Sequence, residues 1–219
     1  MKNFFQFGLI AALFLSLLAP AQAEQARTKK SGVAKKTIQH SPWSRSYQLE
    51  KKGKYAQAAE VISPFRTRGT DQELANMRTA WLEYLQGNYN RAVSGYQAIL
   101  KKNPHSIDGH LGIALPMMAQ KRWREAKHYL SLLLKFAPWH YTAHVRLMSI
   151  EESQRKWKKL AAHAKVMSLR YPNDATTLVY LARAYAWQAR KTQAKNTYAR
   201  VLIRIPGHLE ATSYLKNNR

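Results

Sequence analysis

Residues 175–208 read ATTLVYLARAYAWQARKTQAKNTYARVLIRIPGH, and this stretch decides the fold. Apolar and small residues recur in it three and four positions apart, first around Leu178 and Ala182 and again around Ala194, which is the spacing of one face of an α-helix. A polar stretch separates the two runs, and Pro206 follows the second run, where a proline stops a helix. The stretch therefore predicts two helices joined by a turn.

The same pattern returns along the chain every 34 residues. Prolines hold this register at Pro104, Pro138, Pro172 and Pro206. A second set of mostly small residues does so at Ala58, Ala92, Ala126, Leu160 and Ala194, and a third, core-like set at Ile62, Tyr96, Leu130, Ala164 and Tyr198. One helical pair cannot bury its apolar face alone, so we expect the copies to stack into one elongated core.

These residues resemble the tetratricopeptide repeat family, whose pattern has a Leu–small pair and an aromatic in the first helix, then Ala, an aromatic and a terminal Pro in the second. The copy at 175–208 fits best, through Leu181, Ala182, Tyr185, Ala194, Tyr198 and Pro206. In the copy at 73–106, Thr79 and Glu83 stand where Leu and an aromatic belong, which leaves open a shift of its first helix. In the copy at 141–174, Met148 and Leu160 replace small residues.

The resemblance implies an all-α, right-handed solenoid of about five antiparallel helix pairs with a short C-terminal capping helix. The expected repeats are 39–72, 73–106, 107–140, 141–174 and 175–208, and the cap is 209–219, so that the repeat domain spans 39–219.

The N-terminal segment indicates export. Lys2 precedes an apolar run from Phe4 to Leu18, and small residues at Ala21 and Ala23 form a cleavage site, so residues 1–23 are predicted to be a signal peptide. No cysteine follows to carry a lipid anchor, and the expected product is periplasmic or secreted. Residues 24–38 carry five basic residues and few apolar ones, which is typical of a flexible linker.

The chain is strongly basic, with 36 Lys and Arg against 12 Asp and Glu and a net charge of +24. Such a field attracts anionic polymers, acidic proteins or anionic membranes. Many of the cations fall at the predicted turn inside each pair or just beyond it, which defines a basic ridge of Lys121, Arg122, Arg124, Arg155, Lys156, Lys158 and Lys159. This ridge either binds a polyanion or only keeps the edge solvated, and the sequence does not separate the two.

Aromatic residues interleave with these basic residues, as in proteins that bind single-stranded nucleic acid. However, Tyr55, Tyr89, Trp123 and Trp157 are 34 residues apart, so we interpret them as equivalent core positions and consider nucleic acid an unlikely partner.

The inner wall is the second candidate site. In the resembled family the first helices line the concave face, where equivalent positions here carry Trp43, Tyr47, Met77, Trp81, Leu111 and Leu115. These six residues, the predicted groove, should make the wall apolar over three copies and suit an apolar or amphipathic partner segment. Alternatively, Trp81 faces the core because the first helix of its copy is shifted.

Catalytic chemistry has no support in the sequence. His140 and His144 have the four-residue spacing of helical metal ligands, but no carboxylate accompanies them, and we predict no metal, cofactor or enzyme activity. Two functions remain. The first is a protein-interaction scaffold of the bacterial cell envelope that assists assembly of a secretion, appendage or polymer-export complex. The alternative is electrostatic binding of an anionic polymer, such as exopolysaccharide or cell-wall polymer, or of a membrane surface.

Overall fold

The structure, a computed structural model, describes residues 41–67 and 69–218, so the predicted signal peptide and linker lie outside the described residues. The regular structure of the described ranges is entirely helical, which confirms the predicted fold class. The helices are α2 (Pro42–Lys51), α3 (Tyr55–Ile62), the 3-10 helix η1 (Ser63–Arg66), α4 (Gln72–Leu85), α5 (Tyr89–Lys102), α6 (Ile107–Ala119), α7 (Trp123–Phe136), α8 (Tyr141–Ser153), α9 (Trp157–Arg170), α10 (Ala175–Trp187), α11 (Lys191–Arg204) and α12 (Leu209–Asn217).

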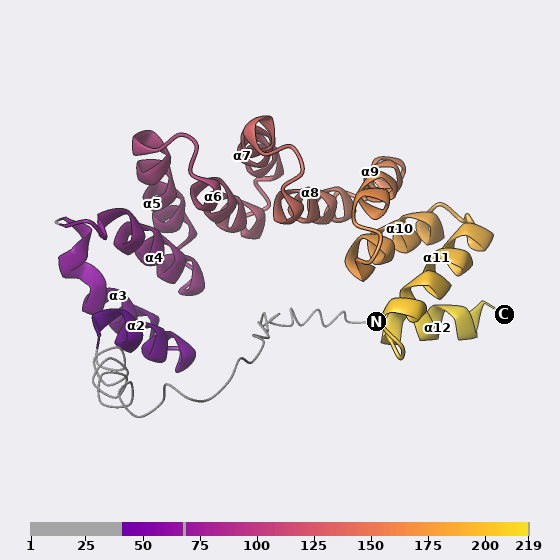
Figure 1. The fold of residues 1–219 in the computed structure, drawn as a ribbon, viewed down its shortest axis with the longest axis horizontal. Coiled ribbons are helices and arrows are strands. Elements are labelled where there is room, and N and C mark those ends of the chain that lie inside the picture. The colour runs from indigo at the N-terminus through magenta and orange to yellow at the C-terminus, as the bar shows by residue number, and fades with distance from the viewer. Residues whose placement is uncertain (1–40, 68, 219) are drawn as a thin grey trace, which may run out of the picture.

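The helices follow one another along an arch (Figure 1). The first helix of each pair, together with α12, lies on the inner side of the arch, and α5, α7, α9 and α11 lie on the outer side. Helix α4 ends at Leu85, which is one period before the end of α6 at Ala119, so its C-terminal boundary keeps the common register. This agreement favours an unshifted first helix in the second copy.

The turns inside the five pairs share one backbone feature. The residue that follows the first helix by two positions has a positive φ in every pair, and these residues are Gly53, Gly87, Lys121, Arg155 and Ala189. Glycine is the residue that adopts this left-handed conformation without steric cost, and it is present in the first two pairs only. The other three turns carry side chains there despite the strain.

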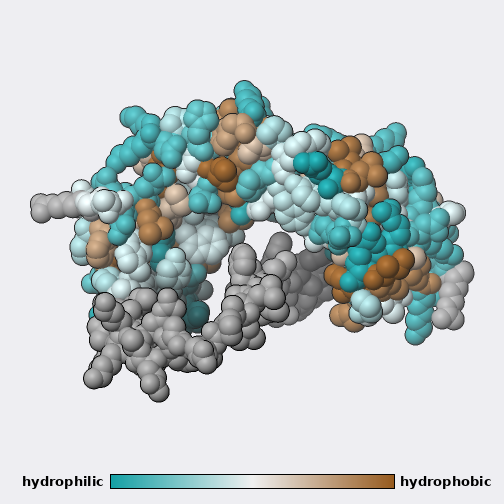
Figure 2. Space-filling view, viewed as in Figure 1, coloured by the Kyte–Doolittle hydropathy of each residue, from teal (hydrophilic) through white to brown (hydrophobic). Residues whose placement is uncertain are grey.

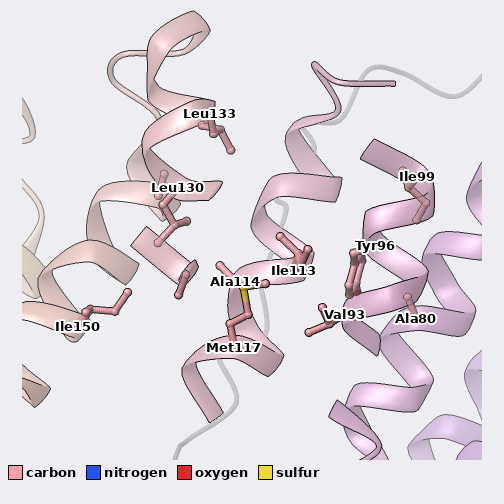
Figure 3. Close-up of a cluster of buried hydrophobic side chains, with 12 residues drawn as sticks. Ala80, Val93, Tyr96, Ile99, Ile113, Ala114, Met117, Leu130, Leu133 and Ile150 are labelled. Atoms are coloured by element: carbon pink, nitrogen blue, oxygen red, sulfur yellow. The ribbon is translucent and has the colours of Figure 1, made fainter. Parts of the chain in front are cut away.

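The core is built from the periodic small and large residues. In the central cluster (Figure 3), Ile113 of α6 lies toward Tyr96 of α5, while Leu130 of α7 and Ile150 of α8 lie on the other side of α6. Each of these side chains is almost fully buried. The large residues therefore fill the space between neighbouring helices, as expected for a stacked repeat.

Two places depart from the regular repeat. Helix α3 ends at Ile62, because Pro64 breaks the second helix of the first pair into the 3-10 helix η1. In the fourth pair, α8 and α9 approach each other less closely than the helices of the other four pairs do. A cavity is lined by residues next to each of these departures.

No helix among residues 41–67 and 69–218 is long and apolar enough to cross a membrane. Hydrophilic residues dominate the face seen in Figure 2, and hydrophobic ones gather in separate patches, one of them over α11 and α12. The exposed apolar side chains at this end of the chain are Ile203, Ile205 and Leu209.

Candidate functional site

The N-terminal part of the inner wall combines aromatic rings with a buried ion pair. Arg78 of α4 lies under Tyr47 of α2, with its guanidinium carbon 3.6 Å from the ring centroid. The same guanidinium pairs with Glu50 at 2.7 Å, and Trp81 donates its indole N–H to Glu50 at 2.9 Å. Tyr47 remains 51% exposed, so it covers the ion pair and offers its outer face to solvent.

The other residues of the predicted groove are partly buried. Trp43 contacts Phe65 with a centroid separation of 5.4 Å and packs on the N-terminal core, as Trp81 does. Met77 and Leu111 pack on the central core, and Leu115 is intermediate in exposure. The six residues thus lie on α2, α4 and α6, but only Tyr47 among them is strongly exposed.

Arginine side chains interrupt the expected apolar wall. Arg78 is one, and Arg146 of α8 is another, donating to the backbone carbonyl of Leu111. Burial lowers the pKa of Arg146, and the nearby hydroxyls of Tyr96 and Tyr84 act in the opposite direction. Within the described ranges no carboxylate pairs with Arg146. The inner wall therefore contains a buried and a partly buried arginine beside the apolar residues that the sequence predicted.

The C-terminal part of the inner wall is polar, in line with its sequence. Arg183 of α10 bridges Glu152 at 3.2 Å and Glu210 at 2.6 Å, and Tyr198 donates its hydroxyl to Glu210 at 2.7 Å. Burial opposes ionisation of Glu210, but hydrogen bonds from Arg183 and Tyr198 outweigh it and hold its pKa below the ordinary value. Because both carboxylates pair with Arg183, they neutralise its charge, and Arg183 attracts an anionic ligand only weakly.

The residues of the basic ridge lie at the turns between α6 and α7 and between α8 and α9. Five are exposed without a carboxylate partner within the described ranges: Lys121, Arg124, Arg155, Lys156 and Lys158. The other two have partners, because Arg122 pairs with Glu125 at 2.5 Å and Lys159 lies 3.4 Å from Glu151. The ridge thus presents mostly unpaired cations.

The aromatic residues beside the ridge pack against the protein. Trp123 lies against the central core, and Trp157 stacks on Trp187 with centroids 5.2 Å apart and planes 5° from parallel. Tyr55 packs on the N-terminal core, and Tyr89 contacts the ring of Tyr84 at 5.9 Å. All four equivalent aromatics are partly buried, so none of them forms a free stacking platform for bases.

The histidines have structural partners. His140 caps α8 by accepting the backbone N–H of Ala143. His144 contacts the Pro138 carbonyl at 2.8 Å and His163 of α9 at 2.9 Å, and His163 contacts Glu151 at 3.0 Å. The sequence showed His144 but gave no sign of this connection, because His163 lies on another helix. No group of three potential ligands suited to a metal occurs within residues 41–67 and 69–218.

A cavity of about 880 Å³ lies on the outer side, over α4 and α5. It is open because the second helix of the first pair stops at Ile62, and its lining mixes acidic and basic residues, including Glu73, Glu83, Arg66 and Arg91. This mixture favours no single ligand charge.

The geometry defines an α-helical repeat protein with a long inner wall. Residues 74–106 and 176–207 match the model of the tetratricopeptide repeat family. The chain thus carries tetratricopeptide-type repeats and has the fold of that family, as its sequence predicted. A search of curated proteins finds no match.

Solved structures share this fold at low sequence identity. A thermophilic tetratricopeptide repeat protein of Thermus thermophilus is 18% identical, with 81% of this chain and 96% of that chain covered and a TM-score of 0.60. PilW, described as a widely conserved type IV pilus biogenesis factor, is 16% identical over 80% of this chain and 85% of its own, with a TM-score of 0.65. YrrB, described as having an unusual peptide-binding site, is 11% identical over 85% and 97%, with a TM-score of 0.61.

Proposed function

We propose that the protein is an exported, non-enzymatic scaffold that holds an extended segment of a cell-envelope protein along its inner wall. A tetratricopeptide fold supports a protein-interaction scaffold. The envelope location draws on the signal-peptide pattern, and the role in assembling a secretion, appendage or polymer-export complex is analogy with the family and with PilW.

The observation that carries the proposal is the arrangement of Tyr47 over Arg78. An exposed aromatic ring fixed in place by a buried arginine is a rigid contact surface, and binding to it costs little side-chain entropy. Farther along the wall, Arg146 offers a cation without a carboxylate partner in the described part of the chain. A segment with apolar residues and an occasional carboxylate complements this surface.

Site-specific photo-crosslinking tests this proposal. A photoreactive phenylalanine analogue at position 47 or at Leu115 should yield a defined partner adduct in envelope extract, while the same analogue at Leu169, which is 73% exposed on the second helix α9, should not. Replacing Tyr47 with Ala should abolish the adduct formed from position 115. Equal adducts from position 169 would refute the inner wall as the binding surface. Trp43 and Trp81 are less suitable positions, because both pack on the core.

The basic ridge supports a second candidate function, binding of an anionic polymer. Its unpaired cations at Arg155, Lys156 and Lys158 carry this reading. Reversing these three charges should lower the salt concentration that elutes the protein from heparin, because polyanion binding weakens steeply with ionic strength. Unchanged elution would reject the ridge as a binding surface. The charge reversal should leave crosslinking at position 47 unchanged, so the two tests are independent.

A further inference from the structure

The fourth helix pair is open because two large residues replace small ones. In the other pairs the positions at which the two helices meet are occupied by Ser46 and Ala58, Ala80 and Ala92, Ala114 and Ala126, and Ala182 and Ala194. The corresponding residues of the fourth pair are Met148 and Leu160, and both are fully buried. Since two large side chains now occupy the contact, α8 and α9 stand farther apart than the other paired helices.

Polar groups occupy part of the space between the separated helices. His144 and Glu151 of α8 and His163 of α9 form a continuous chain of contacts that ends on the Pro138 carbonyl. Glu151 is only 2% exposed, so its carboxylate depends on this chain and on Lys159 for its stability.

The direction of two hydrogen bonds in this chain follows from its geometry. The Pro138 carbonyl only accepts, so His144 donates to it from Nε2. The neutral His144 ring then accepts at Nδ1 from Nε2 of His163, and the other ring nitrogen of His163 faces Glu151. Glu151 is thereby engaged by His163 on one oxygen and by Lys159 on the other.

The lysines around this chain outnumber its single carboxylate. Lys127 of α7 donates to the Gln154 amide oxygen at 3.0 Å, and Lys159 lies 3.4 Å from Glu151. Burial lowers the pKa of Lys127, and the neighbouring charges of Lys156 and Lys159 lower it further. Positive charge therefore exceeds negative charge around this chain.

A cavity of about 460 Å³ connects these groups. Lys127, His144, Glu151, Lys159 and His163 line its polar part, and Leu147, Ala162 and Val166 line its apolar part. The residues that line the cavity come from α7, α8 and α9. Helices α7 and α9 lie on the outer side of the arch (Figure 1). It is separate from the predicted groove, whose residues lie on α2, α4 and α6.

We propose that this cavity binds a small organic anion, with a carboxylate or phosphate group between Lys127 and Lys159 and an apolar body against Leu147 and Val166. The two ammonium groups supply charge, His163 shares the Glu151 carboxylate with Lys159, and the apolar wall selects against fully hydrated inorganic ions.

Titration with three aromatic probes tests the site. Benzoate and phenyl phosphate should each bind saturably and should shift the imidazole C–H resonances of His144 and His163 in NMR spectra. Benzyl alcohol, a neutral analogue, should neither bind nor shift these resonances. Binding of only one anion would identify the preferred head group and still support the site. Absence of saturable binding by both anions, or equal binding of the alcohol, would overturn the proposal.

Matched variants locate the binding. Lys127→Gln should weaken both anions about ten-fold, as expected for the loss of one charged contact. Lys158→Gln also removes one positive charge, from α9. Because Lys158 does not line the cavity, this variant should bind both anions as the parent does. Equal weakening by both variants would show that the general surface field, and not the cavity, attracts the anions.

A second variant tests the cavity without altering charge. Ala162→Phe should fill the exposed mouth of the cavity and block binding, while circular dichroism and melting temperature stay near those of the parent. Undiminished affinity in this variant would also overturn the proposal.

Discussion

The pair α8–α9 and the pair α10–α11 follow each other in the chain and share the same 34-residue plan, yet they pack differently. In α10–α11, Ala182 and Ala194 let the helices approach closely, and neither residue is exposed. In α8–α9, Met148 and Leu160 fill the corresponding positions, and a cavity and a buried carboxylate lie beside them. The comparison indicates that two large side chains at the contact separate the paired helices, and a buried carboxylate lies beside this looser contact.

The largest effect should follow from imposing the open arrangement on the closed pair. Replacing both Ala182 and Ala194, by Met and Leu respectively, overpacks a fully buried contact, and we expect a loss of about 3 kcal/mol or more in the free energy of unfolding. Urea denaturation monitored by circular dichroism measures this loss. Exchanging Met148 for Leu is the matched control, because it keeps the volume at the already open contact. A double variant as stable as the parent would refute the packing explanation.

The next largest effect should follow from removing His163. In the His163→Ala variant, Glu151 stays buried with Lys159 as its only remaining charged partner, and we expect a loss of about 2 kcal/mol. The exposed His128 of α7 provides the control, and its replacement by Ala should leave the unfolding midpoint nearly unchanged. Equal effects at the two positions would mean that the histidine chain does not stabilise the open pair.

A smaller gain should come from the turns of the two pairs. Arg155 and Ala189 have φ values of 55° and 57°, a conformation that costs a non-glycine residue about 1 kcal/mol. Arg155→Gly and Ala189→Gly should each raise the melting temperature, and by similar amounts, since the two turns are equivalent. A gain at position 189 alone would indicate that the open pair responds differently to its turn.

The smallest effect should be a dependence of stability on pH. Burial lowers the pKa of His144, and the nearby His163 and His140 add to this, while the Pro138 carbonyl and Glu151 oppose it. The unfolded chain therefore binds more protons at this residue than the folded chain does. Stability from this group is present above the ordinary histidine pKa of about 6.5 and is lost as pH falls below it. His144→Gln should flatten the decline of stability between pH 7 and pH 5, and an unchanged slope would contradict this assignment.

The sequence predicted the fold from the register of its prolines and small residues, because a repeat constrains every copy in the same way. The substitution of Met148 and Leu160 for small residues was also visible, but its consequence depended on what lies beside them in space. His163 and Glu151 carry no periodic signal, so their contact could not be predicted. Arg78 was missed for a related reason, since its partner Glu50 lies on a different helix and pattern analysis treats arginine as a surface residue.

Helix α8 contributes to two separate hydrophobic clusters. Ala143 and Ile150 belong to the cluster shared with α4 to α7, whereas Met148 belongs to the one shared with α9 to α11. We therefore expect the arch to bend most easily at α8, near its midpoint. A small rotation there displaces both ends of the arch by a larger distance. A rotation at α8 would therefore change the distance between the two ends of the inner wall, and hence the length of segment that it spans.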